Sequence, residues 1–327
     1  MTGVLFTCAG QRVDIVTAFR HAGGETVAVD VNPLAPALYH ADQHVLVPPY
    51  GSEEYVPRLQ ELVQEHAIAL VLPLTDLDMT VLAERRNELG ATVLLPGSEV
   101  VERATDKYAT HLFLEQHGIG SPEAWLPEEL PGDLPFPVLV KPRRGFGSRN
   151  IFVASDRVEL DFYLARTPVA SFVERVCQGE EFSIDVFCDL EGACLNAIPR
   201  TMIESKGGES IKGMTIRDEE LIELGRRVAE TMGIQGPATV QCFRTSPGRP
   251  EVTDVNLRFG GAFPLPLAAG GAYPSLALAL ARGERPEPRV GSFREGVVMT
   301  RFFSGICLME EEGGTLELLG EEVSPGR

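Results

Sequence analysis

Three polar side chains alternate along one short segment near residue 255. Asp254, Asn256 and Arg258 are two residues apart in a run whose composition is typical of a β-strand. Because alternate side chains of a strand point to the same face, a carboxylate, an amide and a guanidinium would lie side by side. Hard cations prefer oxygen ligands, and arginine stabilises phosphoryl charge. The pattern therefore predicts a site for a divalent cation and a phosphate group.

A second strand-like run, residues 238–243, precedes this segment and contains Gln241. A turn at residues 246–248 separates the two runs, so they can pair antiparallel. That pairing would bring Gln241 next to Asp254. It adds Gln241 to Asp254 and Asn256 as a candidate metal ligand.

Lys141 ends an apolar strand-like run at residues 136–140, and a basic, glycine-containing loop at residues 143–149 follows it. Glycines let backbone N–H groups approach phosphate oxygens closely, so the lysine and the loop together suit a phosphate. The loop has neither Walker A nor GxGxxG spacing, and it joins two strands. An ordinary basic hairpin loop therefore stays open as the alternative.

Two carboxylates stand at the ends of neighbouring strand-like runs. Glu174 ends residues 170–174, and Glu181 begins the next run. Carboxylates in these places can accept hydrogen bonds from ribose hydroxyls or an adenine amino group, or they can be solvated edge charges. Lys107 follows a predicted helix start, where a surface lysine is the ordinary interpretation.

The pattern of elements divides the chain near residue 104. Residues 1–104 alternate Val/Leu/Ile-rich strands with helices, which is typical of a doubly wound parallel sheet. Residues 105–327 read as an α+β region with antiparallel strands. A nicotinamide-dependent oxidoreductase would need a glycine fingerprint after the first strand, and Cys8-Ala9-Gly10-Gln11-Arg12 lacks one.

Composition excludes several classes of protein. The net charge of -18 and pI of about 4.8 argue against a nucleic-acid-binding surface. No apolar run reaches the ~20 residues of a membrane span, and the N-terminus does not resemble a signal peptide. The six cysteines have no CxxC pair or metal spacing. We therefore expect reduced thiols in a cytoplasmic protein.

The order of these motifs resembles the ATP-grasp superfamily, and within it the carbamoyl-phosphate-synthase-like branch. "VLFTCAGQRVDIVTAF" and "LVLPLTDLDMTVLA" look like its pre-ATP-grasp domain, and "ATDKYATHLFLEQHGIGSPEAW" looks like the entry to the ATP-grasp domain. "FPVLVKPRRGFGSRNI", "SFVERVCQGEEFSIDVF" and "VQCFRTSPGRPEVTDVNLRFGG" resemble its phosphate strand and loop, its nucleotide hinge and its metal strands. The resemblance implies a pre-ATP-grasp domain at 1–104 and a two-lobed ATP-grasp domain at 105–327, with a lid subdomain at about 122–180.

The resemblance also implies a role for each candidate residue. Lys107 and Lys141 would hold ATP phosphates, and Gly145, Phe146, Gly147 and Ser148 would fold over them. Glu174 and the backbone near Val176 would meet adenine, and Glu181 would bind the ribose. Gln241, Asp254 and Asn256 would bind Mg²⁺, and Arg258 would steady the γ-phosphate. The family usually has glutamate where this chain has Asp254.

Members of this family use ATP and Mg²⁺ to activate a carboxylate as an acyl phosphate and transfer it to an amine-type nucleophile. The implied partners are small carboxylate and amine molecules, and two copies can associate as a homodimer. A non-catalytic nucleotide-binding protein, or an enzyme acting on bicarbonate or carbamate, remains the alternative. Arg200, Lys206 and Lys212 suggest an anionic substrate, whereas the aliphatic residues 265–267 suit an apolar one.

Overall fold

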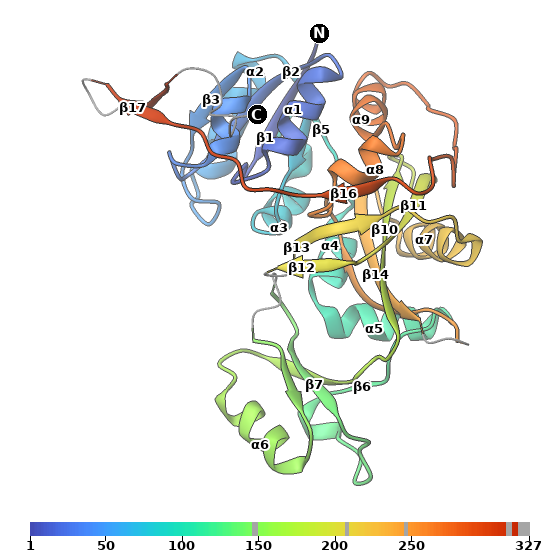
Figure 1. Ribbon diagram of the computed structural model, residues 1–327. Helices are drawn as coiled ribbons and strands as arrows, with labels where there is room; N and C mark the ends of the chain where they lie inside the picture. The colour runs from blue at the N-terminus through green and yellow to red at the C-terminus, as the bar shows by residue number, and fades with distance from the viewer. Residues whose placement is uncertain (146–149, 207–208, 245–247, 312–315, 320–327) are drawn as a thin grey trace. The chain divides into compact units, whose positions relative to one another are not determined.

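The computed structural model describes residues 1–145, 150–206, 209–244, 248–311 and 316–319 of the 327-residue chain. They form two compact units, whose elements are labelled in Figure 1. Unit 1 comprises Met1–Leu94, Ala272–Arg285 and Thr300–Arg327, and unit 2 comprises Leu95–Gly271 and Pro286–Met299. The domain boundary proposed at residue 104 lies inside unit 2.

Unit 1 contains the expected parallel sheet, in the order β3-β2-β1-β4-β5. Its central strand is apolar on both faces, and Val4, Leu5 and Phe6 are completely buried. This is the pattern of a strand that helices cover on both sides. The strands are β1 Thr2–Thr7, β2 Gly24–Asp30, β3 Gln43–Leu46, β4 Ile68–Pro73 and β5 Thr92–Val93.

The helices of unit 1 come from both ends of the sequence. They are α1 Val13–His21, η1 Pro36–His40, α2 Tyr55–Glu65, α3 Met79–Glu84, η2 Arg86–Glu88 and α9 Tyr273–Ala281. Helix α9 packs against α1 and β4. A Cβ built on Gly24 of β2 would lie 3.1 Å from the Phe19 carbonyl oxygen of α1, so the glycine lets α1 approach the sheet closely, and Leu278 of α9 packs near the same position. The hairpin β17 Leu308–Glu310 and β18 Leu316–Leu318 belongs to the same unit.

The main sheet of unit 2 is antiparallel, in the order β11-β10-β14-β15. Its strands are β10 Glu180–Cys188, β11 Cys194–Thr201, β14 Gly236–Arg244 and β15 Glu251–Asn256. Helix α7, Glu219–Met232, packs on β10 and β11. The Asp218 side chain caps its first turn by accepting from the Leu221 N–H, and Gly233 ends the helix at φ +72°.

A smaller sheet, β6-β9-β7-β8, forms a second lobe of unit 2 with helix α6 against it (Figure 1). Val138, Val140, Leu160 and Val173 make its core. The elements are β6 Ala124–Trp125, η3 Pro127–Glu129, β7 Val138–Pro142, β8 Phe152–Ala154, α6 Arg157–Arg166 and β9 Ser171–Arg175. This lobe lies within the segment proposed as a lid.

Some elements of unit 2 were not predicted from the sequence. Helix α4, Ser98–Thr105, precedes α5, Lys107–Gln116, and Asp106 between them accepts hydrogen bonds from the first turn of α5. Residues 204–206 and 209–214 form β12 Glu204–Lys206 and β13 Glu209–Met214, which make a sheet with β16 Val298–Thr300. Helix α8 spans Pro264–Ala268.

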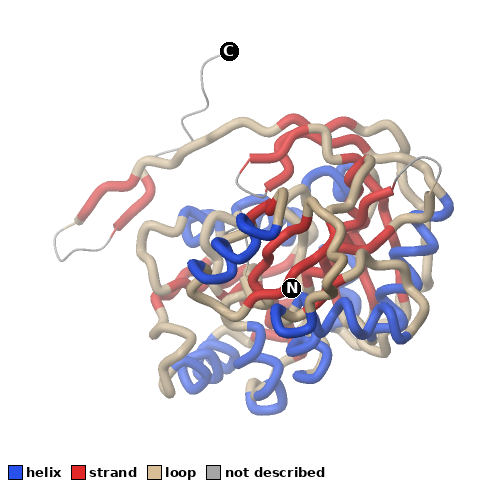
Figure 2. The backbone as a smooth tube through the Cα atoms, turned by 90° about the horizontal axis from the view of Figure 1, so that it is seen from below, coloured by secondary structure: helices blue, strands red, loops and turns tan. Residues whose placement is uncertain are grey.

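The fold class inferred from the sequence is confirmed, with a parallel α/β sheet followed by antiparallel sheets. Figure 2 distinguishes the helices, strands and loops of the chain by colour. Among the described helices, none has the length and apolar character needed to cross a bilayer. All six cysteines are free, and Cys188, Cys194 and Cys242 are buried in the main sheet of unit 2.

Substituting Gly225 tests the close packing of α7 on the main sheet. A Cβ at this position would lie 2.5 Å from Ile184 Cγ2, and Ile184 is completely buried. We expect Gly225→Leu to lower the free energy of unfolding by about 1–3 kcal/mol through overpacking. Urea denaturation measures the change, and Glu219→Leu on the exposed part of α7 is the control. Equal stability of the two variants would contradict the packing.

Candidate functional site

One residue from each strand of the main sheet contributes to a polar row on a single face. Arg200 of β11 pairs with Ser183 of β10, and Ser183 pairs with Gln241 of β14. Gln241 in turn pairs with Asp254 of β15, which confirms the antiparallel pairing expected from the sequence. Directly paired residues project to the same side of a sheet, so the row presents its polar groups together.

A β-bulge at Thr253 turns Asp254 toward this face. Gln241 pairs with Asp254, but the next residue, Cys242, pairs with Val252, so Thr253 has no opposite partner. Val252 and Cys242 are buried on the other face of the sheet. In a regular strand without the bulge, Asp254 would share the face of Val252, because side chains two residues apart point the same way. The bulge therefore places the carboxylate beside Gln241.

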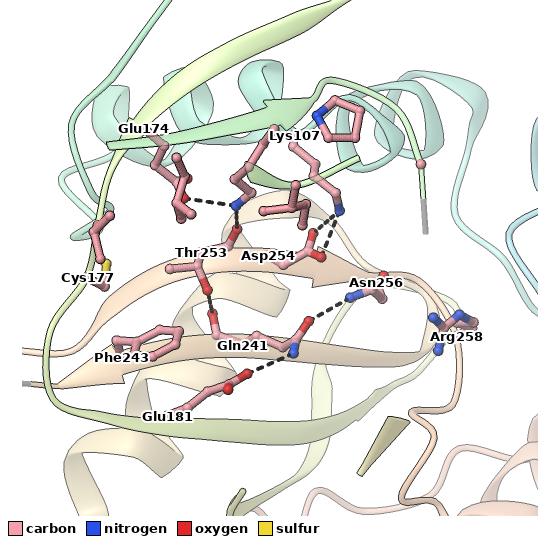
Figure 3. Close-up of a pocket in the computed structure, with 16 residues that line it drawn as sticks. Lys107, Glu174, Cys177, Glu181, Gln241, Phe243, Thr253, Asp254, Asn256 and Arg258 are labelled. Carbon is pink, nitrogen blue, oxygen red and sulfur yellow. Dashed lines mark hydrogen bonds and ion pairs between the residues drawn. The ribbon is translucent and has the colours of Figure 1, made fainter. Parts of the chain in front are cut away.

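Lys107 holds both oxygens of Asp254. Its Nζ donates to Oδ1 and Oδ2 at 2.7 Å each, and both side chains are largely shielded from water (Figure 3). Lys107 is the first residue of α5, and its backbone N–H donates to the Arg143 carbonyl. Burial raises the pKa of Asp254, but the charges of Lys107 and Lys141 outweigh this effect and hold the pKa below its usual value. The carboxylate is therefore ionised at neutral pH.

Lys141 and Glu174 form a second, more deeply buried ion pair on the smaller sheet. The Lys141 Nζ donates to Glu174 Oε2 at 2.9 Å and lies 3.4 Å from the Thr253 carbonyl oxygen. The side chains are 9% and 5% exposed. Burial raises the pKa of Glu174, and Lys141 partly offsets the rise. Two charges can be buried here because each one balances the other.

Glu181, Gln241 and Asn256 form a chain of hydrogen bonds across three strands. The Gln241 amide N–H donates to Glu181 Oε1 at 3.3 Å, and the Asn256 amide N–H donates to Gln241 Oε1 at 3.4 Å. Burial raises the pKa of Glu181, while the Arg200 charge and the Gln241 hydrogen bond oppose the rise. The long distances leave these groups able to bind a ligand instead.

These groups line one pocket of about 340 Å³ in unit 2. Every candidate residue that the structure describes contributes to it: Lys107, Lys141, Gly145, Glu174, Val176, Glu181, Gln241, Asp254, Asn256 and Arg258. The remaining candidates, Phe146, Gly147 and Ser148, lie outside the described residues. The polar residues selected from the sequence are thus brought together.

The pocket also has apolar walls that sequence analysis missed. Leu139, Ile151 and Phe243 line it beside Val176, which the sequence had already indicated. Leu139 stands two residues before Lys141, and Phe243 stands two residues after Gln241, so each shares a strand face with a chosen polar residue. That spacing is the signal that would have identified them. A flat apolar group suits these walls, and the cations suit an anionic group.

The polar end of the pocket fits a magnesium ion by the chemistry of its donors. Asp254 offers a carboxylate, and Gln241 and Asn256 offer amide oxygens on the same face. Within the described ranges, no three His, Cys, Asp or Glu residues gather in a metal-binding group. One carboxylate with neutral oxygens matches Mg²⁺, which keeps several waters and binds substrate phosphates.

Cys177 lines the same pocket but is not an activated nucleophile. Burial, and then the negative charges of Glu251 and Glu174, raise the pKa of its thiol to about 12. The Sγ lies 3.8 Å from Glu251 Oε2. Because the thiolate is the reactive form, this cysteine is inert at neutral pH.

Two family models match separate parts of the chain. The model described as "PylC-like, N-terminal domain" matches residues 4–94. The model described as "ATP-grasp in the biosynthetic pathway with Ter operon" matches residues 169–302, which include the polar row.

Individual relatives are distant. The carbamoyl phosphate synthase large chain of Thermus thermophilus is 26% identical over 251 residues, covering 70% of this chain. The chain spans only 24% of that relative's length.

Solved structures share the fold. The biotin carboxylase domain of Hydrogenobacter thermophilus 2-oxoglutarate carboxylase, a dimer in complex with MgADP, ADP and bicarbonate, is 16% identical with a TM-score of 0.75. The alignment covers 98% of this chain and 83% of that one. An L-amino acid ligase from Bacillus licheniformis is 19% identical with a TM-score of 0.69, over 90% of this chain and 78% of the other.

The Lys107–Asp254 ion pair predicts a pH dependence of stability. The folded pKa of Asp254 is lowered, so its stabilising contribution is present above the unfolded pKa of ~3.9 and is lost as the pH falls toward the folded value. In Lys107→Met this contribution is reduced. We expect wild type to be the more stable protein at pH 6, with the difference shrinking by pH 3. Urea denaturation across this range measures it, and a constant difference would contradict the pairing.

Proposed function

We propose that this chain, a member of the ATP-grasp superfamily, is an ATP- and Mg²⁺-dependent ligase that joins a carboxylate to an amine-type nucleophile. One observation carries the proposal: Lys107, Lys141 and Asp254 open onto the same pocket. Phosphoryl transfer depends on positioning and on neutralising charge, and fixed cations beside oxygen ligands supply both.

The nucleotide would lie along the length of the pocket. The adenine would pack on the apolar walls near Leu139 and Val176, and Glu181 would accept hydrogen bonds from the ribose hydroxyls. Lys141 would bind phosphate oxygens. A contact between Glu174 and adenine stays a prediction. Because Glu174 accepts a hydrogen bond from Lys141, it would also hold the Lys141 ammonium in place.

Lys107 would exchange partners when the nucleotide enters. It now neutralises Asp254 through both carboxylate oxygens. Phosphate oxygens offer the ammonium an alternative anion, and the carboxylate then becomes available to a cation. Asp254, Asn256 and Gln241 would hold the magnesium ion, which neutralises charge on the phosphates when bound.

The reaction would proceed in two displacements. A substrate carboxylate oxygen attacks the γ-phosphorus, which gives an acyl phosphate and ADP. The nucleophile then attacks the acyl carbon and releases phosphate. Arg258, at the polar end of the pocket, would balance the negative charge of the transferred group. Side-chain nucleophiles have no part in this scheme, which agrees with the inert thiol of Cys177.

Bicarbonate or carbamate is the second candidate substrate class. Similarity to a carbamoyl phosphate synthase large chain and to a biotin carboxylase domain bound to bicarbonate favours it.

That biotin carboxylase domain is a dimer, so a homodimer remains our proposal for this chain as well. Analytical ultracentrifugation of the purified protein distinguishes a homodimer from a monomer.

A substrate screen tests the ligase proposal. We expect Mg²⁺-dependent release of ADP from ATP with a subset of carboxylate and amine pairs, with bicarbonate included among the carboxylates. Asp254→Ala should lower the rate by about 100-fold or more, because it removes the charged metal ligand. Asp218→Ala, which removes an ion pair with Arg244 away from the pocket, is the matched control. Near-normal ADP release from Asp254→Ala would refute its metal role.

Measurements of nucleotide binding distinguish the two proposed roles of Asp254, as a metal ligand and as the ion-pair partner of Lys107. In wild type, Mg²⁺ should tighten ATP binding measured by isothermal titration calorimetry. In Asp254→Asn the metal effect should fall by about ten-fold or more, whereas ATP binding with excess chelator should be equal or tighter because Lys107 is released. The same metal effect in both proteins would argue against exchange of the Asp254 partner.

A further inference from the structure

A second, smaller cavity of about 50 Å³ adjoins the polar end of the pocket in unit 2. The two cavities share Gln241, Asn256 and Arg258. The smaller one extends from these residues across the sheet to Ser183 of β10 and Arg200 of β11. Its volume admits a group of a few heavy atoms, such as a carboxylate.

Three buried polar groups on this cavity lack a hydrogen-bond partner among the described residues. They are the hydroxyls of Ser183 and Ser210 and the Nη1 of Arg200. The three residues are 0%, 3% and 2% exposed. Burying a polar group without a partner costs about 1–3 kcal/mol, so three around one cavity need an explanation. A ligand group that accepts hydrogen bonds supplies it.

The surroundings of Arg200 make the cavity suitable for an anion. The Arg200 Nε donates to Asp185 Oδ2 at 2.7 Å, and Thr239 donates to Asp185 Oδ1 at 3.1 Å. Both oxygens of the nearby carboxylate are therefore engaged. The guanidinium groups of Arg200 and Arg258 can only donate, and serine hydroxyls can donate as well.

Two glycines, Gly260 and Gly213, allow close packing around the smaller cavity. A Cβ on Gly260 would lie 2.7 Å from Thr239 Oγ1 and 2.9 Å from Asp185 Oδ1. A Cβ on Gly213 would lie 2.8 Å from the Thr201 carbonyl and 3.6 Å from Ser210 Oγ. The absence of side chains at both positions lets the strands and the ion pair approach each other.

We infer that Arg200, Ser183 and Ser210 bind a substrate carboxylate that is not the one being activated. Arg200 stands at the far end of the row from Asp254, with Ser183 and Gln241 between them. Neighbouring strands are ~4.8 Å apart, so the backbone positions of Arg200 and Asp254 are separated by ~14 Å. A group at Arg200 is therefore set apart from the metal ligands where phosphoryl transfer would occur.

The inference rests on the proposed function for the identity of the reaction, and it names the substrate class: small molecules with an additional carboxylate. That carboxylate belongs either to the acyl donor or to the amine acceptor. It is consistent with the anionic substrate suggested by Arg200 in the sequence. Lys212, suggested with it, instead binds Glu204 at 2.6 Å, and the Lys206 side chain lies outside the described residues.

Equilibrium binding tests the subsite without turnover. Isothermal titration calorimetry with the full chain and MgADP compares succinate with butyrate, and glycine with glycinamide. We expect succinate to bind at least ten-fold more tightly than butyrate, or glycine at least ten-fold more tightly than glycinamide, because each has the additional carboxylate that its partner lacks. The first pair identifies the acyl donor as its source, and the second identifies the amine acceptor. No preference in either pair would overturn the inference.

Variants then assign the preference to these residues. Ser183→Ala, Ser210→Ala and Arg200→Lys should each reduce it at least ten-fold, and Arg200→Lys keeps a charge beside buried Asp185. Without ligand, both serine variants should have a Tm equal to or above that of wild type, because a buried unpaired hydroxyl is removed. Ser121→Ala, which loses a hydrogen bond to His111, is the control and should have a lower Tm. Serine variants that lose stability as the control does, or that keep the preference, would overturn the assignment.

The same measurements separate this subsite from the ligase proposal. Carboxylate preference without ADP release from any substrate pair would leave the subsite standing and refute the ligase. ADP release with butyrate and glycinamide as efficient as with succinate and glycine would support the ligase and refute the subsite.

Discussion

Charges withdrawn from water need a partner inside the protein, and the pocket of unit 2 is organised by this constraint. Lys107 is balanced by Asp254, Lys141 by Glu174, and Arg200 by Asp185. Each pair joins residues from different elements, so the cations are fixed before any ligand arrives. Internal carboxylates thus balance these cations, as the phosphates of a bound nucleotide would. We consider this preorganisation the main contribution of the fold to the proposed chemistry.

The antiparallel register of the main sheet in unit 2 brings polar residues that are distant in sequence onto one face. Pairing across β11, β10, β14 and β15 aligns four polar residues on one face, while the opposite face packs against α7. The bulge at Thr253 is needed because the apolar and polar residues of β15 would otherwise share a face. Local irregularity and regular pairing together determine where the carboxylate points.

Much of this site followed from the sequence, because strand periodicity is a local property. Asp254, Asn256 and Gln241 were identified by spacing and by the turn between their strands. The bulge was not foreseen, since nothing in the composition near Thr253 marks it. The hydroxyls of Ser183 and Ser210 were also missed, because a serine in a strand is unremarkable until distant strands leave it buried and unpaired. Helix α4 was overlooked because its eight residues carry only a short periodic pattern.

The discontinuity of unit 1 has a consequence for biosynthesis. Helix α9 packs against α1 and β4, yet all of Leu95–Gly271 is translated between them. A ribosome delivers the N-terminal strands first, and their sheet waits for α9 until most of unit 2 has been made. During that interval apolar surface near Gly24 stays uncovered, so we expect nascent chains to depend on chaperones at this stage.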